Sequence, residues 1–238
     1  MEISFSQQRV YLECPWQYKL RFVDGRRPPQ TPESALGISL HRALESYYRD
    51  SAGDAGLDRL LDCFERRRVR PRTLDPKEDK LWADKGRRIL KRCFELEADR
   101  RSQVAGVERE FVYPLGRHTV RGMIDRIDLL PDGGHEIIDY NPRVGEWGAS
   151  ESAARSLQLR FYALGAKESL AMKPAVLTVI ELSKAKILSV PYDPSGEEEL
   201  KALILKAADG IEGGGMTPET SFCPRCSFKS DCSNSTAA

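Results

Sequence analysis

The sequence predicts an α/β protein with one mixed β-sheet flanked by helices. Three observations support this: helical periodicity fills residues 34–101, β-prone runs begin at Val104, and helical and β-prone segments alternate after residue 150. A chain of 238 residues can bury one such core but not a second of similar size. We therefore expect a single domain over residues 1–238, with a helical lobe at 34–101 inserted before a core at 104–212.

The first segment is expected to be an interrupted helix. Ser4 or Ser6 can cap its start, and Cys14-Pro15 breaks or restarts it because proline cannot donate the helical hydrogen bond. A proline-rich connection follows at residues 25–32. We expect further helices at residues 34–49, 57–69, 80–99, 151–169 and 194–211.

Five strands are expected, at residues 107–113, 120–130, 135–141, 175–182 and 187–192. Residues 131–134, Pro-Asp-Gly-Gly, are types that strongly favour a turn, so the second and third strands should make a hairpin. Asp125 lies in the first strand of this hairpin and Asp139 near the end of the second. Two carboxylates on paired strands can hold a divalent cation. Asp128 falls on the opposite face from Asp125, where we expect a salt bridge or a turn contact.

The overall composition limits the classes of function. Lys plus Arg number 37 and Asp plus Glu 36, so a nucleic-acid surface must come from local clustering of charge. No apolar run reaches membrane-spanning length, and the first residues lack a signal-peptide pattern. We therefore expect a cytoplasmic protein with no membrane partner. Six cysteines are too few for a secreted disulfide scaffold of this length, and their uneven placement points to metal.

Three cysteines near the end of the sequence form a C-x2-C-x5-C pattern. They are Cys223, Cys226 and Cys232. Cys14 is the best candidate for a fourth ligand, because Cys63 and Cys93 lie in helical patterns where cysteine usually packs as a small hydrophobe. Four thiolates suit either structural zinc or an iron–sulfur cluster, and spacing alone leaves both open. Either group would tie the two ends of this sequence together.

Several motifs follow one another in a characteristic order. They are SQQRVYLECPWQY (6–18), GISLHRALE (37–45), GMIDRID (122–128), DYN (139–141), QLRFY (158–162) and the closing cysteine pattern. Together they resemble the iron–sulfur branch of the PD-(D/E)XK nucleases, which includes RecB-like nuclease domains, the AddB C-terminal nuclease and CRISPR-associated exonucleases. The resemblance covers the chain from one end to the other.

The resemblance implies a restriction-endonuclease-like fold and a metal site. In that family the corresponding groups hold Mg2+ or Mn2+, and here they are His41, Asp125, Asp139 and the carbonyl of Tyr140. Gln158 and Tyr162 would contact the DNA backbone or a metal-bound water. The resemblance also favours a 4Fe-4S cluster over zinc on Cys14, Cys223, Cys226 and Cys232, in an element formed by residues 1–24 and 215–238.

One position departs from the family pattern. The family's catalytic lysine corresponds to Asn141, which can hydrogen-bond a water but brings no charge. Losing such a stabiliser of developing negative charge typically costs about a hundred- to a thousandfold in rate. Arg155 or Arg143 could supply the charge instead, the site could retain its metal and be slow, or the protein could bind DNA without cleaving it.

Arginine clusters in the helical lobe are candidates for contacts with DNA phosphates. From these clusters and the helix that carries Gln158 we take Arg67, Arg68, Arg88 and Arg155. Two functions result: a metal-dependent DNA nuclease, most readily an exonuclease on single-stranded or end-containing DNA, or a catalytically silent DNA-binding or scaffold subunit. Repair, recombination and CRISPR adaptation are the implied pathways. The sequence has no G-x4-G-K-[ST] phosphate loop, so a helicase would be a separate partner.

Overall fold

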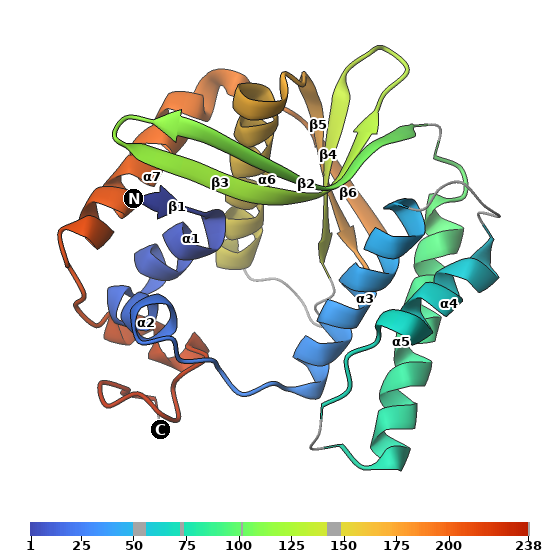
Figure 1. Cartoon of the computed structure of the whole chain (residues 1–238), viewed down its shortest axis with the longest axis horizontal. Coiled ribbons are helices and arrows are strands. Elements are labelled where there is room, and N and C mark those ends of the chain that lie inside the picture. The colour runs from blue at the N-terminus through green and yellow to red at the C-terminus, as the bar shows by residue number, and fades with distance from the viewer. Residues whose placement is uncertain (50–55, 72–73, 101, 142–148, 238) are drawn as a thin grey trace. The chain divides into compact units, whose positions relative to one another are not determined.

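Figure 1 shows a computed structural model of the chain, which describes residues 1–49, 56–71, 74–100, 102–141 and 149–237, the side chains of 149–156 excepted. The α-helices are α1 (Phe5–Glu13), α2 (Pro15–Tyr18), α3 (Pro32–Arg49), α4 (Leu57–Arg67), α5 (Pro76–Glu97), α6 (Ala149–Leu170) and α7 (Glu197–Glu212). The strands are β1 (Glu2–Ile3), β2 (Gln103–Leu115), β3 (His118–Leu129), β4 (His135–Asn141), β5 (Pro174–Glu181) and β6 (Lys186–Pro191). The α/β class is therefore confirmed.

The chain divides into two compact units. Unit 1 comprises Met1–Pro29, Phe111–Gly122 and Asp193–Ala238, and unit 2 comprises Gln30–Glu110 and Met123–Tyr192. Strands β2 and β3 contribute residues to both. The helices expected within residues 34–101 lie in unit 2, as does the β3–β4 pairing from Arg126 onward.

Unit 2 contains the mixed part of the sheet. Strand β3 pairs antiparallel with β4, in a register that places Arg126 opposite Ile138. Strand β4 pairs parallel with β5, and β5 pairs antiparallel with β6. The turn between β3 and β4 contains Gly133 at φ 83°, a conformation that glycine adopts without strain. The hairpin prediction and the mixed sheet are thus both confirmed.

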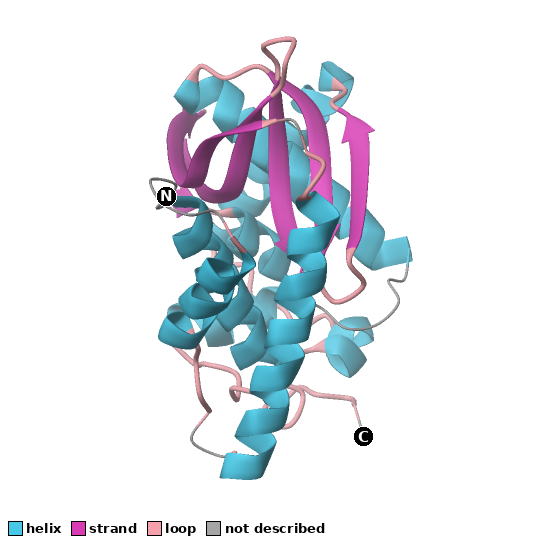
Figure 2. Cartoon of the chain, turned by 90° about the vertical axis from the view of Figure 1, so that its right-hand side faces the viewer, coloured by secondary structure: helices cyan, strands magenta, loops and turns pink. Residues whose placement is uncertain are grey.

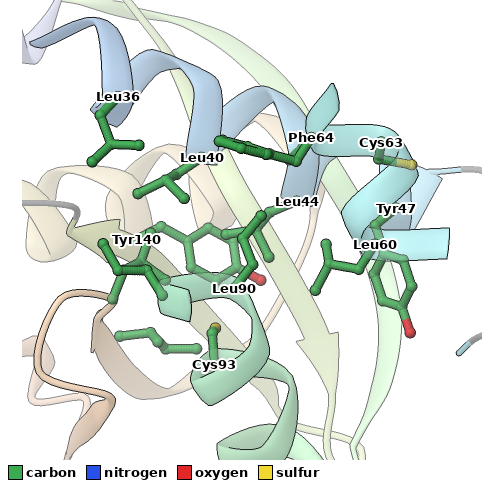
Figure 3. Packing of buried hydrophobic residues seen from close by; sticks show 14 of the residues in the cluster. Leu36, Leu40, Leu44, Tyr47, Leu60, Cys63, Phe64, Leu90, Cys93 and Tyr140 are labelled. Carbon is green, nitrogen blue, oxygen red and sulfur yellow. The ribbon is translucent and has the colours of Figure 1, made fainter. Parts of the chain in front are cut away.

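Helices pack on both faces of these strands, as the colouring in Figure 2 makes visible. On one face, Leu36, Leu40 and Leu44 of α3 pack with residues of α4 and α5 against Tyr140 (Figure 3). Cys63 and Cys93 belong to this buried cluster, which confirms the expectation that they act as small hydrophobes. Helix α6 covers the other face, where Asp139 lies.

Helix α5 begins earlier than the apolar periodicity suggested. Its first residue is Pro76, and Asp75 forms a capping box with Glu78. The Asp75 carboxylate accepts hydrogen bonds from the backbone N–H groups of Lys77 and Glu78, both at 2.8 Å. Proline is favoured at the first helical position because its missing N–H has no helical partner there in any case.

Unit 1 has a helical start with the expected interruption. Ser4 caps α1 in a capping box with Gln7, and the helix ends at Glu13 before Cys14 and Pro15. The short strand β1 was not expected, and it pairs parallel with β3, Ile3 lying opposite Val120. Helix α1 packs against α7, and the Tyr11 hydroxyl donates a 2.9 Å hydrogen bond to the carbonyl of Gly215.

Among the described helices, none combines the length and the apolar character that crossing a bilayer requires.

Candidate functional site

The histidine of the α3 motif and the first aspartate of the hairpin meet in unit 2. Nδ1 of His41 lies 3.5 Å from Oδ2 of Asp125, and the two side chains are 31% and 14% exposed. The same carboxylate oxygen accepts a 3.0 Å hydrogen bond from the backbone N–H of Tyr140. Asp125 is therefore held in place by the neighbouring strand, and His41 and Asp125 both remain partly exposed.

The second aspartate is held by helix α6. Nε2 of Gln158 donates a 2.7 Å hydrogen bond to Oδ1 of Asp139 and lies 3.1 Å from the hydroxyl oxygen of Tyr162. Asp139 is only 3% exposed. Asn141, two residues further along the strand, is 1% exposed, and its carbonyl accepts a 2.9 Å hydrogen bond from Leu182. The structure thus places the predicted residues of α3, β3, β4 and α6 within one unit.

Glu108 lies near Asp125 and also near Glu45 and Arg49. Burial together with the charges of Asp125 and Glu45 raises the pKa of Glu108 to about 7, while Arg49 acts in the opposite direction. Arg49 pairs with Glu45 at 3.0 Å. Glu108 also has a positive φ of 46°, rare for a residue with a side chain. No motif in the sequence indicates this grouping, because the acids come from α3, β2 and β3 and meet only in the folded protein.

The opposite face of the hairpin carries a buried charge network. Arg126 binds Asp128 through two hydrogen bonds of 2.6 and 2.7 Å, and its Nη1 donates to Glu97 at 2.6 Å and to Tyr140 Oη at 3.1 Å. Burial opposes ionisation of Asp128, but hydrogen bonds from Arg126 and Ser102 and the charges of Arg126 and Arg100 outweigh it, so its pKa is lowered. The prediction that Asp128 forms a salt bridge away from the site is confirmed.

The predicted DNA-contacting arginines differ in their surroundings. The Arg68 guanidinium pairs with Asp79 at 2.6 Å and its side chain is only 9% exposed, so a contact with DNA would compete with this ion pair. Arg67 and Arg88 are exposed. The Arg155 side chain lies outside the described part of the chain, as does Arg143 entirely.

The four predicted cysteine ligands line one cleft in unit 1. Cys14, Cys223, Cys226 and Cys232 surround it together with Gln17. Backbone N–H groups already point at two of the sulfurs, from Glu219 to Cys14 and from Phe228 to Cys226, both at 3.4 Å. Burial raises the pKa of the Cys226 thiol, and the three other sulfurs lie near enough to add to this.

A second cluster of potential ligands in unit 1 is already neutralised. His118, Asp209 and Glu212 bring ligand atoms within 4.8 Å of one another. However, Arg117 lies 2.7 Å from Asp209 and 3.3 Å from Glu212. We assign no ion to this cluster, because the arginine occupies the carboxylates that an ion would need.

Comparison with known proteins places the chain in a family. No curated protein gives a significant match. Among solved structures, the crystal structure of SSO0001 is similar at 14% sequence identity and a TM-score of 0.42, over 94% of this chain and 96% of that one. The family model described as "PD-(D/E)XK nuclease superfamily" matches residues 2–233. The match therefore covers nearly the whole chain, and the protein belongs to the PD-(D/E)XK nuclease superfamily.

Proposed function

We propose that the protein is a divalent-metal-dependent DNA nuclease whose site is built from His41, Asp125, Asp139 and the carbonyl of Tyr140. The observation that carries this proposal is the presence of an imidazole and two carboxylates on three packed elements of one unit, with Asp139 fixed by Gln158. One imidazole with carboxylate and carbonyl oxygens suits Mg2+ or Mn2+. When bound, such a metal supplies Lewis acidity and an activated water.

The residues around this site have separate roles in the proposal. Gln158 orients Asp139 and is in turn contacted by Tyr162, so both act through the carboxylate or on the DNA backbone. Asn141 can orient a water but cannot neutralise charge on a phosphate. The proposed enzyme is therefore slow, or it takes a cation from another residue. Arg49, which lies near Glu108, is a described candidate beside Arg143 and Arg155.

Asn141 also favours a second candidate function. Without a cation at this position, the protein would bind DNA and leave it intact, acting as a silent subunit of a repair, recombination or CRISPR-adaptation complex. In either case we infer that the protein acts on or binds DNA with a free end or a single strand. We also infer that it acts in the cytoplasm and that any helicase it works with is a separate chain.

We further propose that Cys14, Cys223, Cys226 and Cys232 hold a 4Fe-4S cluster. Their sulfurs line one cleft, but in the described part of the chain no three of them come within 4.8 Å of one another. Tetrahedral zinc with bonds of about 2.3 Å would bring its thiolates closer than that. Gln17 also lines the cleft, and its Oε1 is buried with no hydrogen-bond partner among the residues that the structure describes.

The decisive experiment for the nuclease is digestion of end-labelled single-stranded DNA with Mn2+. Three proteins are compared: the unaltered chain, Asp125→Ala and Asn141→Lys. Cleavage by the first that is absent from Asp125→Ala supports the active enzyme. Cleavage by Asn141→Lys alone, with DNA binding by all three, supports the silent subunit. No DNA binding and no cleavage by any of them would overturn both.

The cluster is tested separately by anaerobic purification followed by absorption spectroscopy and metal analysis. We expect a brown protein with about four iron atoms, and a colourless, less stable Cys226→Ala variant. Cys63→Ala is the matched control, because this thiol lies in the core of unit 2 and should leave the colour unchanged. Stoichiometric zinc, or a brown Cys226→Ala protein of normal stability, would contradict the proposed cluster.

A further inference from the structure

Helix α3 has an exposed side, opposite the leucines that pack into the hydrophobic cluster of unit 2 (Figure 3). Ile38, Arg42 and Arg49 lie on this side and are all exposed. The helical repeat of about 3.6 residues aligns them in one narrow stripe, here called the α3 stripe. His41 borders the α3 stripe, and its Nδ1 lies 3.5 Å from Oδ2 of Asp125. The α3 stripe therefore runs beside the proposed metal site.

Three arginines of unit 2 lie near residues of the site, and they differ in their availability to a ligand. Arg126 is buried on the opposite face of the hairpin, where it binds Asp128. Arg49 forms an ion pair of 3.0 Å with Glu45, one turn before it on α3. Arg42 is exposed and forms no ion pair with any residue in the described part of the chain. Arg42 can therefore bind an anion without breaking an internal pair.

The proposed site is rich in carboxylates, which repel a phosphate. Asp125 and Asp139 each contribute one, and Glu108 lies near Asp125. One divalent metal ion offsets two negative charges, and this leaves no excess of positive charge for an incoming phosphate. Asn141 adds no charge. A further cation at the edge of the site would therefore favour DNA binding, and Arg42 is available there.

Arg42 and His41 are consecutive residues, so their Cα atoms lie about 3.8 Å apart. Successive side chains leave an α-helix about 100° apart around its axis, so Arg42 does not enter the metal site together with His41. Its long side chain nevertheless extends from the same turn of the helix. A guanidinium carries its N–H donors in a planar fork that matches phosphate oxygens. This arrangement suits a phosphate next to the one that lies at the metal.

We propose that Arg42 binds a backbone phosphate of the DNA strand, beside the phosphate that lies at the proposed metal site. The inference rests on the proposed function and adds a substrate contact to it, at a residue outside the arginine clusters of the helical lobe. Contacts to phosphates position a strand but carry no sequence information. Arg42 therefore orients the strand along the α3 stripe in the same way for every DNA sequence.

The test uses the full chain carrying Asp125→Ala, so that bound DNA stays intact. Fluorescence anisotropy measures its affinity for a labelled single strand at several salt concentrations, with and without Arg42→Ala. We expect Arg42→Ala to weaken binding about fivefold, the upper range for one exposed charge pair. The slope of log affinity against log salt should fall in magnitude by about 0.7, the value for one phosphate of a single strand. Thermal stability should not fall, because Arg42 has no described ion-pair partner and alanine favours a helix.

Three control variants separate this contact from a general effect of charge. Arg42→Lys keeps the charge and should recover most of the affinity. Ile38→Ala changes an uncharged residue of the α3 stripe, and Lys206→Ala removes an exposed cation of α7 with no ion pair among the described residues, so each should stay within about twofold of the parent. Unchanged affinity and salt slope in Arg42→Ala, or an equal loss in Lys206→Ala, would overturn the inference and leave the nuclease proposal intact. A parent that binds no DNA would overturn both.

Discussion

Gln158 of helix α6 donates a hydrogen bond of 2.7 Å to Asp139 at the end of strand β4. Groups that orient a metal ligand typically affect affinity by about ten- to a hundredfold. We expect Gln158→Leu to weaken Mn2+ binding about tenfold, measured by the loss of the free Mn2+ signal in electron paramagnetic resonance. Tyr162→Phe removes the hydroxyl that accepts a hydrogen bond from Gln158 and leaves Gln158 in place, so it should have a smaller effect. Wild-type Mn2+ affinity in Gln158→Leu would show that the amide does not support the site.

The pairing of Arg126 with Asp128 should dominate the stability of unit 2. Both side chains are almost fully buried, so Arg126→Met leaves Asp128 and Glu97 without their main cation. Breaking such a pair costs about 3–5 kcal/mol. We expect urea denaturation to show a loss of this size. The loss of stability comes from Asp128 being left buried without a cation. The double exchange Arg126→Met with Asp128→Leu should therefore recover part of the free energy of unfolding, and no recovery would contradict this account.

Glu108 makes the stability of the metal-free protein depend on pH. Its folded-state pKa is about 7, whereas the unfolded chain ionises near the ordinary value for glutamate. Between these two pKa values Glu108 ionises in the unfolded chain but not in the folded protein, so the free energy of unfolding falls as the pH rises. Above the folded-state pKa this loss is complete and stays constant.

Replacing Glu108 should reveal this cost. Glu108→Gln is expected to raise the free energy of unfolding by about 1 kcal/mol at about pH 8, allowing for solvent screening of a partly exposed group, and by much less at about pH 5. Chemical denaturation at the two pH values measures the difference. An equal effect at both would mean that the carboxyl titrates normally.

Gly86 permits the close crossing of helices α4 and α5. A Cβ atom at this position would overlap the ring of Phe64, which is fully buried. Glycine to alanine in the middle of a helix normally stabilises by about 1 kcal/mol. Here overpacking should outweigh that gain, so Gly86→Ala is expected to lower the melting temperature. Phe64→Leu added to Gly86→Ala should relieve the overlap, and a more stable Gly86→Ala protein would contradict the packing argument.

Local signals in the sequence predicted most elements of the fold. The hairpin followed from the turn at residues 131–134, and the break before Pro15 followed from proline chemistry. The helix expected from residue 80 begins at Pro76 instead, because the Asp75-Pro76 cap starts the helix before its apolar periodicity becomes visible. Strand β1 was missed because two residues carry no periodic pattern.

The site residues were predictable only where a motif contains them. Nothing local to Glu108 indicates its left-handed backbone or the nearby Glu45 and Asp125, because these acids meet only after folding. Likewise a run of arginines does not reveal which member is paired. Arg68 pairs with Asp79, eleven residues later in the sequence, whereas Arg67 is exposed.

The side chain of Tyr140 belongs to the buried cluster of unit 2, and its neighbours along strand β4 are Asp139 and Asn141. Its ring packs with leucines of α3 and α5, and its N–H holds Asp125. Strand β4, which carries two of the proposed metal-binding groups, therefore cannot open without disrupting the hydrophobic cluster that α3, α4 and α5 form on it. Native-state hydrogen exchange of the β4 amides should follow the same cooperative opening as α3 and α5, so the site persists intact until that whole assembly melts.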